Sequence, residues 1–303
     1  MPFDIIIPGH YFCDLIFTGL DHFPALGTEI FGQGVAVTTG GGALNTSIAL
    51  RRLGVNVGWA GVLGNDFFSQ YVHKALQKEG LSDTLLTRLD APLSRVTVAL
   101  SYPDDRAFVT YADTPPDLID LAHKALEKTT PKHIHFAGLV ISEDTVAFMD
   151  ECKKRGVRVS MDCQHREETL DDSLVRETLS QLDLFMPNAI EAQRLTRSDN
   201  LATALQLLSD LVPTLVVKNG AEGAVVCCNG EQFQEPALSL TPLDTTGAGD
   251  CFNAGFLAAH LQGRDWSECL RWGNFCGGQS TLGVGGSKAP SLAELQRWLV
   301  QEQ

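Results

Sequence analysis

Short apolar runs alternate with amphipathic segments along most of the chain. The run at 4–8 (DIIIP) is typical of a buried strand, and 44–53 has apolar residues at helical spacing before a glycine. Residues 55–62 then predict another strand, and 67–79 another helix that a glycine ends. This order of strand, helix, strand and helix predicts a parallel sheet that helices cover on both faces.

The alternation continues through the second half of the chain. Further strands are expected at 133–137, 157–161, 184–186, 215–218 and 223–228. Helices are expected between most of them, at 142–154, 174–181, 189–196 and 201–211. Repeats, linkers and low-complexity stretches are missing from the sequence, so one α/β domain over 1–303 is the expected organisation.

Two early segments, 19–39 and 92–111, break this rhythm because they alternate apolar and polar residues without an intervening helix. The second predicts a hairpin that turns at Pro103, Asp104 and Asp105. Strands of this kind form a small sheet of their own. We therefore expect a projecting β-sheet lid made from segments at about 15–39 and 92–111.

Composition and charge narrow the class of protein. Hydrophobic residues make up 44% of the chain and charged residues 20%, which is enough for a sizeable core. The net charge of −14 speaks against nucleic-acid and membrane partners, which require a basic surface. The N-terminal segment has no basic region ahead of an apolar one, and the eight cysteines are scattered, so a cytoplasmic protein with reduced thiols is expected.

The segment 243–256 (LDTTGAGDCFNAGF) carries the clearest chemistry. Gly247, Ala248 and Gly249 have minimal side chains directly before a helical pattern, so their backbone N–H groups can converge on an anion at a helix N-terminus. Asp250 follows in the first turn, where a carboxylate beside a bound phosphate suits the removal of a proton from an attacking hydroxyl. The alternative is that Asp250 only caps the helix.

This segment resembles the C-terminal signature of the ribokinase or PfkB carbohydrate kinase family, D-T-x-G-A-G-D. Three glycines at 40–42 with Asn45, and GVLGND at 61–66, are similar to the family's N-terminal pattern. Gly42 stands where ribokinase has lysine, which puts ribose in doubt as the substrate, and Ser69 stands where glycine is common.

The resemblance implies a fold and an activity. The fold is a ribokinase-like three-layer sandwich with a mostly parallel central sheet and a small β-sheet lid. The activity is ATP-dependent phosphorylation of a hydroxyl group on a small sugar or sugar-like acceptor. A nucleoside kinase of the same family and a ligand-sensing relative that has lost catalysis stay open as alternatives.

The resemblance also assigns catalytic and acceptor roles. It makes Asp250 the general base and the backbone at Gly247, Ala248 and Gly249 the anion hole. The residues implied to bind the acceptor are Asp14, Gly41, Gly42 and Asn45. A carboxylate such as Asp14 is a good acceptor for the hydroxyls of a diol.

A third set of residues is implied to bind ATP and Mg²⁺. Asn188 and Glu191, in MPNAIE, resemble the family's N-x-x-E motif for magnesium and phosphate, and they also fit a helix capping box. Lys218, Gly220 and Gly223 match the turn over the phosphates. Asn274 lies where the family contacts adenine.

A monovalent cation, typically K⁺, is the last implied cofactor. Its ligands would come from Asp244, Thr246, Ser280, Gly283, Gly285 and Ser287. Arg166 is a candidate for contact either with an acidic or phosphorylated acceptor or with a surface acid of the protein. Arg95 and Arg106, on the projecting β segment, are candidates for reaching into the acceptor site. In related kinases the lid pairs two subunits, so a homodimer through the lid is expected.

Overall fold

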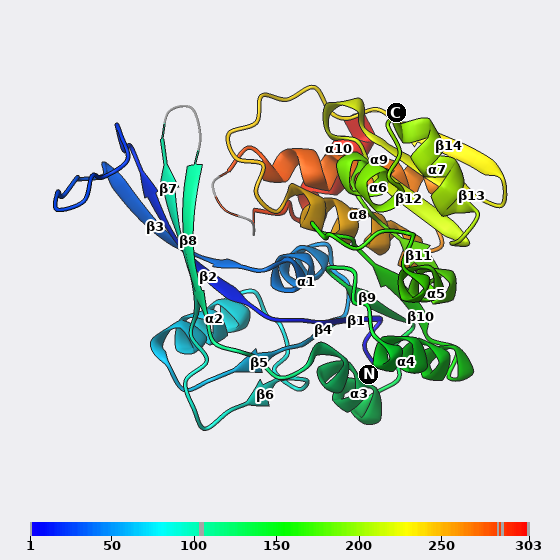
Figure 1. Ribbon diagram of the computed structural model, residues 1–303, viewed down its shortest axis with the longest axis horizontal. Helices are drawn as coiled ribbons and strands as arrows, with labels where there is room; N and C mark the ends of the chain where they lie inside the picture. The colour runs from blue at the N-terminus through cyan, green and yellow to red at the C-terminus, as the bar shows by residue number, and fades with distance from the viewer. Residues whose placement is uncertain (1, 103–105, 284, 286–287, 302–303) are drawn as a thin grey trace.

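The computed structural model describes residues 2–102, 106–283, 285 and 288–301, and its centre is an eight-stranded sheet (Figure 1). The strand order is β14-β13-β12-β11-β10-β9-β1-β4. The strands are β1 (Ile5–Pro8), β4 (Val57–Ala60), β9 (His133–Phe136), β10 (Arg158–Met161), β11 (Leu184–Phe185), β12 (Thr214–Lys218), β13 (Ala224–Cys228) and β14 (Glu231–Glu235). Neighbours from β4 to β12 run parallel, whereas β13 and β14 are antiparallel. The expected mostly parallel central sheet is confirmed, with an antiparallel edge formed by β13 and β14.

Helices cover both faces of this sheet. One layer contains α1 (Gly42–Arg52), α8 (Ala248–Leu261), α9 (Trp266–Ser280) and α10 (Leu292–Gln301). The other contains α3 (Leu118–Lys128), α4 (Glu143–Lys154), α5 (Ser173–Gln181), α6 (Ala189–Thr196) and α7 (Leu201–Ser209). Alternate residues of β1 point to opposite layers: Ile5 and Ile7 pack with Phe256 of α8, and Ile6 packs with Phe148 of α4. The apolar strands of the sequence therefore lie in the middle of three layers.

The predicted lid is a separate four-stranded sheet of order β3-β2-β7-β8, at the left of Figure 1. It consists of β2 (Phe12–Thr18), β3 (Gly34–Gly40), β7 (Arg95–Ser101) and β8 (Arg106–Ala112). The antiparallel pairs are β2 with β3 and β7 with β8, while β2 and β7 are parallel. The turn predicted at residues 103–105 lies outside the described residues.

A smaller element supports the base of the lid. Strands β5 (Val62–Leu63) and β6 (Thr87–Arg88) pair beside α2 (Phe67–Lys78), which Asp66 caps through the N–H groups of Phe68 and Ser69. The hydroxyl of Ser69 donates to Asp66 at 2.7 Å and meets the Tyr11 hydroxyl at 2.9 Å. Serine at this position therefore has a structural role that glycine could not fill.

The structure also bears on membrane insertion and thiol chemistry. Across the part of the chain it describes, every helix is too short or too polar to cross a membrane. All eight cysteines are free, and most are buried. Burial raises the pKa of Cys251 to about 12, which keeps that thiol protonated at neutral pH.

Candidate active site

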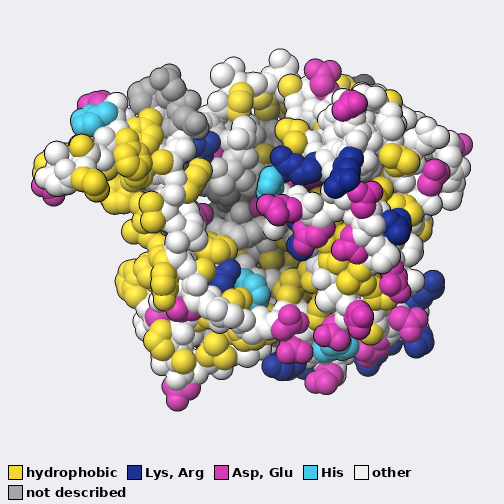
Figure 2. Space-filling view, in the orientation of Figure 1, with side chains coloured by type: hydrophobic (Ala, Val, Ile, Leu, Met, Phe, Trp, Pro, Cys, Tyr) yellow, Lys and Arg dark blue, Asp and Glu magenta, His cyan; other side chains and the backbone are white. Residues whose placement is uncertain are grey.

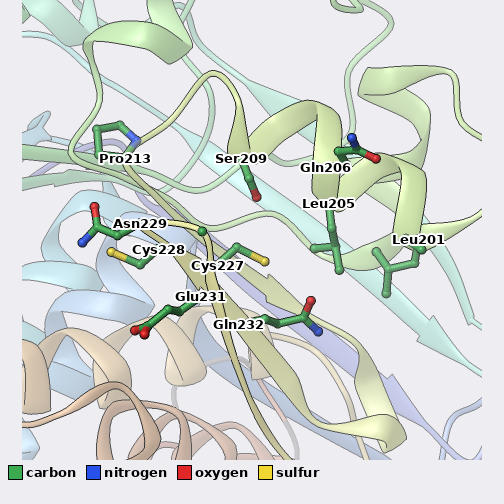
Figure 3. A pocket seen from close by; sticks show the side chains of 12 residues that line it. Leu201, Leu205, Gln206, Ser209, Pro213, Cys227, Cys228, Asn229, Glu231 and Gln232 are labelled. Carbon is green, nitrogen blue, oxygen red and sulfur yellow. The ribbon is translucent and has the colours of Figure 1, made fainter.

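Among the pockets on the body of the molecule, two lie against the β12–β14 side of the central sheet, and they differ in the chemical groups that line them. The pocket between α7 and the β13–β14 hairpin has a volume of about 450 Å³ (Figure 3). Leu201, Leu205 and Cys227 are among its lining residues, and Glu231 is the only charged residue that lines it among those the structure describes. This pocket has no arrangement suited to catalysis.

The second pocket, of about 540 Å³, lies at the carboxyl ends of the parallel strands. Asp162 follows β10, Asn188 follows β11, and Lys218 ends β12, and all three line it with Asp250 of α8. Ligands of open α/β sheets bind at this edge. The molecular surface is hollowed between the lid and the body, as Figure 2 shows.

The predicted anion hole is the start of α8. Gly247 is the N-cap residue, with φ of 74°, and no side chain caps the helix. Its left-handed conformation favours glycine and turns the chain so that the first N–H groups of the helix line the pocket. The helix dipole adds partial positive charge there. Asp250 lies in the first turn and is not the cap, so the capping alternative is wrong.

Asp250 is held in place by a residue of the N-terminal motif. Asn45 Nδ2 donates to Asp250 Oδ2 at 2.9 Å, across 205 residues of sequence. Burial raises the pKa of Asp250 to about 6, although the Asn45 hydrogen bond lowers it. At neutral pH this carboxylate is ionised but close to its pKa, which suits a general base.

The main chain of the glycine turn, residues 40–42, passes close to the carboxylates of Asp14 and Asp250. A Cβ atom on Gly42 would lie 2.9 Å from Asp250 Oδ1, and one on Gly40 would lie 2.2 Å from Asp14 Oδ2. Gly41 between them has φ of 94°, in the region that favours glycine. Residues 40–42 therefore leave room for a small molecule to reach both acids.

Several polar atoms around this turn have no hydrogen-bond partner. Thr38 Oγ1 and Asn45 Oδ1 are buried and unpaired among the described residues. The Asp14 carboxylate also accepts no hydrogen bond from the described chain, and burial raises its pKa to about 6. Buried polar groups normally have partners, so a ligand with several hydroxyl groups would complete this set.

A buried polar network lies on the nucleotide side of Asp250. Lys218 Nζ donates to Asp162 at 2.7 and 2.8 Å and to Asn253 Oδ1 at 3.3 Å, and Asn253 Nδ2 donates to Asp162 at 2.6 Å. A Cβ atom on Gly249 would lie 3.6 Å from Lys218 Nζ. The predicted phosphate contact Lys218 therefore lies beside the anion hole, paired with an acid.

Sequence analysis did not identify the role of Asn253. This residue lies three positions after Asp250 in α8, on the same helix face, so the helical spacing within NAGF was the available signal.

Asn188 and Glu191 form the capping box at the start of α6. Asn188 Oδ1 accepts the Glu191 N–H at 2.9 Å, and Glu191 Oε2 accepts the Asn188 N–H at 2.7 Å. Oε1 of Glu191 has no partner among the described residues, and both side chains line the pocket. Burial raises the pKa of Glu191. A carboxylate oxygen at this place fits a metal-bound water, so the residues present suit magnesium.

The remaining predicted nucleotide residues surround the same pocket. Gly220 is the first residue of the short 3₁₀ turn η1 (Gly220–Glu222) and Gly223 follows it; both have positive φ, and both line the pocket. Asn274 Nδ2 donates to the carbonyl groups of Glu235 and Pro236, each at 3.0 Å. Asn274 therefore fixes the chain after β14 at the pocket wall, and its contact with adenine stays a prediction.

The predicted cation loop shows a different arrangement from the one expected. Asp244 accepts hydrogen bonds from the Thr246 N–H at 2.8 Å, the Gly285 N–H at 3.0 Å and Arg106 Nη1 at 2.8 Å. Ser280 Oγ donates to the Gly277 carbonyl at 2.7 Å. A guanidinium group of the lid thus contacts the one carboxylate in the predicted ligand set.

Of the other two predicted cation ligands, Gly283 packs near the Lys288 side chain, where a Cβ atom would lie 3.0 Å from Lys288 Cγ. Ser287 lies outside the described residues.

The other arginines considered for contact with the acceptor also have protein partners. Arg95 donates to the carbonyl groups of Tyr11 at 3.0 Å and Asp113 at 2.9 Å. Arg166 pairs with Glu168 at 2.8 Å and donates to the Leu139 carbonyl. These contacts correct the expectation that Arg95 reaches into the acceptor site, and for Arg166 they match the alternative of a contact with a surface acid.

Comparison with known proteins places this site in a family. The model of the pfkB family carbohydrate kinases matches residues 5–292. The chain is 27% identical to a cytidine kinase of Thermococcus kodakarensis, over 89% of this chain and 93% of that protein. It is 25% identical to a fructokinase of Vibrio alginolyticus (86% and 92%) and 24% identical to a ribokinase of Haemophilus influenzae (92% and 92%).

Solved structures share the fold over nearly the whole length. A putative ribokinase II from E. coli has a TM-score of 0.83 at 22% identity, covering 98% of this chain and 99% of that one. Ribokinase from Arabidopsis thaliana, complexed with ribose and ATP, has a TM-score of 0.81 at 20% identity and 99% coverage of both chains. The chain therefore belongs to the pfkB family of carbohydrate kinases and is a phosphotransferase with an alcohol group as acceptor.

Proposed function

We propose that this protein transfers the γ-phosphoryl group of ATP to a hydroxyl group of a small sugar-like acceptor, with Asp250 as the general base. One observation carries the proposal. The Asp250 carboxylate lies in the first turn of α8, whose N-terminus no side chain caps, and also next to Gly42 and Asn45 of the glycine turn. It can therefore contact an acceptor hydroxyl and a phosphate at the same time.

The backbone supplies the charge stabilisation in this scheme. The N–H groups at Gly247, Ala248 and Gly249 hold the transferring phosphoryl group, and their fixed dipoles stabilise its negative charge. The Ala248 N–H donates to the Thr245 carbonyl at 3.2 Å in the structure, and it would exchange this contact for the phosphoryl group. Lys218 adds a positive charge close to Gly249. Asp162 and Asn253 keep the Lys218 ammonium group in one position.

ATP occupies the 540 Å³ pocket in this proposal. Gly220 and Gly223 let the main chain approach the phosphates closely. Magnesium, when bound, neutralises charge on the phosphates, and Glu191 is placed to hold one of its water ligands. Asn274 shapes the wall where the base would lie.

The acceptor is proposed to be a neutral polyol. Asp14, Thr38 and Asn45 offer unpaired oxygen atoms that match neighbouring hydroxyl groups. Arg95 and Arg166 are bound to other groups of the protein, so they supply no countercharge for an acidic acceptor.

A nucleoside is the second candidate acceptor, because the lid also offers an apolar surface. Phe108 is 60% exposed. It pairs with Ala99 across the lid sheet, and Ala99 pairs with Ile16. Ile16 lies two residues after Asp14 in β2, so all four side chains are on the same face of the lid. An aromatic side chain near a diol-binding acid suits a molecule that joins a flat base to a ribose ring. A cytidine kinase is among the relatives.

The opposite face of the lid supports a homodimer. Val35, Val109 and Tyr111 are exposed to 64%, 62% and 60%, and the register places them on one face with Leu15 and Phe17. Apolar side chains gather along the lid in Figure 2. A contiguous apolar sheet face of this kind typically mediates protein association, and we propose that a second copy of the chain covers it.

An acceptor screen tests the proposed function. Purified protein, ATP and Mg²⁺ are combined with a panel of sugars, polyols and nucleosides, and acceptor-dependent ADP release is followed together with the mass of the product. The proposal expects at least one neutral acceptor to gain a phosphoryl group, with Asp250→Asn as the inactive control. Binding of ATP and acceptor without any product would favour the ligand-sensing alternative.

A further inference from the structure

Arg106 makes a contact between the lid and the body that the proposed chemistry has not used. It lies at the start of β8, and its Nη1 donates to Asp244 Oδ1 at 2.8 Å and to Thr246 Oγ1 at 3.0 Å. The two ends of this contact are 138 residues apart in sequence. The Arg106 side chain is 31% exposed and that of Asp244 only 7%.

Asp244 is a buried carboxylate whose hydrogen-bonding capacity is largely used by the protein. It accepts from the backbone N–H groups of Thr246 and Gly285, from the Thr246 hydroxyl and from Arg106. Burial alone would raise the pKa of Asp244, but these hydrogen bonds lower it, so the group is charged. A buried charge needs a compensating one, and the guanidinium supplies it.

This contact lies directly before the anion hole. Thr246 precedes Gly247, whose left-handed conformation begins α8. Asp244 binds both the backbone and the side chain of Thr246, and Arg106 binds the Thr246 hydroxyl. The contacts of Asp244 and Thr246 therefore fix the loop that orients the N–H groups of the anion hole.

We propose that Arg106 is a positioning residue: the closed lid brings its guanidinium to Asp244 and thereby orders the anion-hole loop, in place of a monovalent cation. A fructokinase from Vibrio cholerae, of the same fold, has been solved in a potassium-bound form. In this chain the positive charge comes from the lid, so closure over the acceptor and assembly of the anion hole are coupled. The inference rests on the proposed kinase function.

The first test is a potassium titration of the wild-type enzyme at constant ionic strength, with tetramethylammonium as the replacing ion. The proposal expects kcat and KM to change by less than about twofold, because a charge-assisted contact already neutralises Asp244. Thermal unfolding is followed in the same buffers, and potassium is expected to leave the midpoint unchanged. A tenfold or greater activation by potassium would overturn the proposal.

The second test removes the guanidinium. Arg106→Ala is expected to lower kcat/KM about a hundredfold, mostly through kcat, because a misplaced anion hole costs catalysis even when its groups are intact. Added guanidinium or potassium ions should restore part of the loss. Arg106→Lys, which keeps the charge, should retain more activity than Arg106→Ala.

Arg88→Ala is the matched control, because Arg88 is an exposed arginine whose ion pair with Asp83 lies away from the pocket. This variant should behave like wild type with and without added ions. An Arg106→Ala enzyme with wild-type kcat, or one that no cation rescues, contradicts the proposed role. If Arg106→Ala does not fold, the wild-type potassium titration decides alone. Failure of the acceptor screen would count against the kinase function instead.

Discussion

The central sheet and the lid sheet differ in how deeply their side chains are buried. The inner strands of the central sheet are buried on both faces, whereas its edge strand β14 is largely exposed, and residues such as Phe136 are completely shielded from solvent. The lid sheet has one face over the cleft and another that exposes Val35 and Val109. Burial of apolar side chains against the central sheet thus provides most of the stability, whereas the lid buries few apolar side chains.

In the proposed active site, this difference separates the catalytic groups of the body from the acceptor-binding groups of the lid. The body carries the rigid groups, Asp250 with the anion hole and Lys218 with its polar network. The lid carries Asp14, which is proposed to meet the acceptor, and Arg106, which contacts Asp244 of the body. Chemistry is therefore fixed by the body, and recognition and closure by the lid.

The largest expected effect comes from the core of the body. Phe136→Ala should lower the free energy of unfolding by about 3–5 kcal/mol, because it removes a fully buried ring and leaves a cavity. Chemical denaturation measures this loss. Phe31→Ser, at a lid residue that is 83% exposed, should change the stability by less than about 0.5 kcal/mol. Equal losses at the two positions would contradict the division between body and lid.

A smaller effect is expected at the acceptor site. Asp14→Ala removes an unpaired carboxylate and should raise KM for the acceptor by about ten- to a hundredfold, as expected for lost hydrogen bonds to a charged group. KM for ATP should stay close to the wild-type value. Steady-state kinetics with each substrate varied in turn provides the measurement, with the exposed lid residue Asp21 changed to Ala as the control.

The pH dependence of activity sharpens the assignment of Asp250. Its raised pKa means that the base is protonated below pH of about 6, so kcat/KM should fall about tenfold per pH unit there and level off above. Asp14, with a pKa also raised to about 6, makes the fall steeper. A flat profile from pH 5 to pH 7 would exclude both acids from the rate-determining steps.

Stability must be measured across the same pH range, because the buried His135 also makes the folded protein less stable as the pH falls. Burial lowers the pKa of His135 from 6.5 to about 4 in the folded protein. Between these two pKa values the imidazole is protonated in the unfolded chain but not in the folded protein. The free energy of unfolding therefore falls as the pH drops from 6.5 toward 4. Activity data are compared only where the protein remains folded.

The smallest effect on catalysis is expected from the outer face of the lid. Val35→Asp places a charge on the proposed dimer face and should shift the mass measured by light scattering from two chains to one. Turnover per chain should change by less than about twofold, since Val35 points away from Asp14. A wild-type protein that is monomeric at all concentrations would contradict the proposed dimer.

Much of this architecture could be predicted from local sequence. Alternation of apolar runs and helices indicated the layered sheet, and the small residues at 247–249 indicated the anion hole before α8. Contacts between distant segments could not be read in this way. The ion pair of Arg106 with Asp244 and the network of Asn253 with Asp162 depend on how the lid and the strand ends meet in space.

Local signals also left some roles undecided. Glu191 serves the capping box and lines the pocket, so the pattern N-x-x-E fits both a structural and a metal-binding role. Strand β13 has the same apolar character as its parallel neighbours, so its antiparallel direction follows from the turn that joins it to β12. Strand β14 is mostly polar and exposed, so it gives no signal of a buried strand.

The most direct test of the central claim compares turnover by the wild-type enzyme and by Asp250→Asn at saturating ATP and acceptor. The account predicts that kcat falls by about 10²–10⁴ while the affinity for ATP is retained, because the exchange removes the base and keeps its shape. Unchanged phosphorylation of the acceptor by Asp250→Asn would contradict the proposed mechanism.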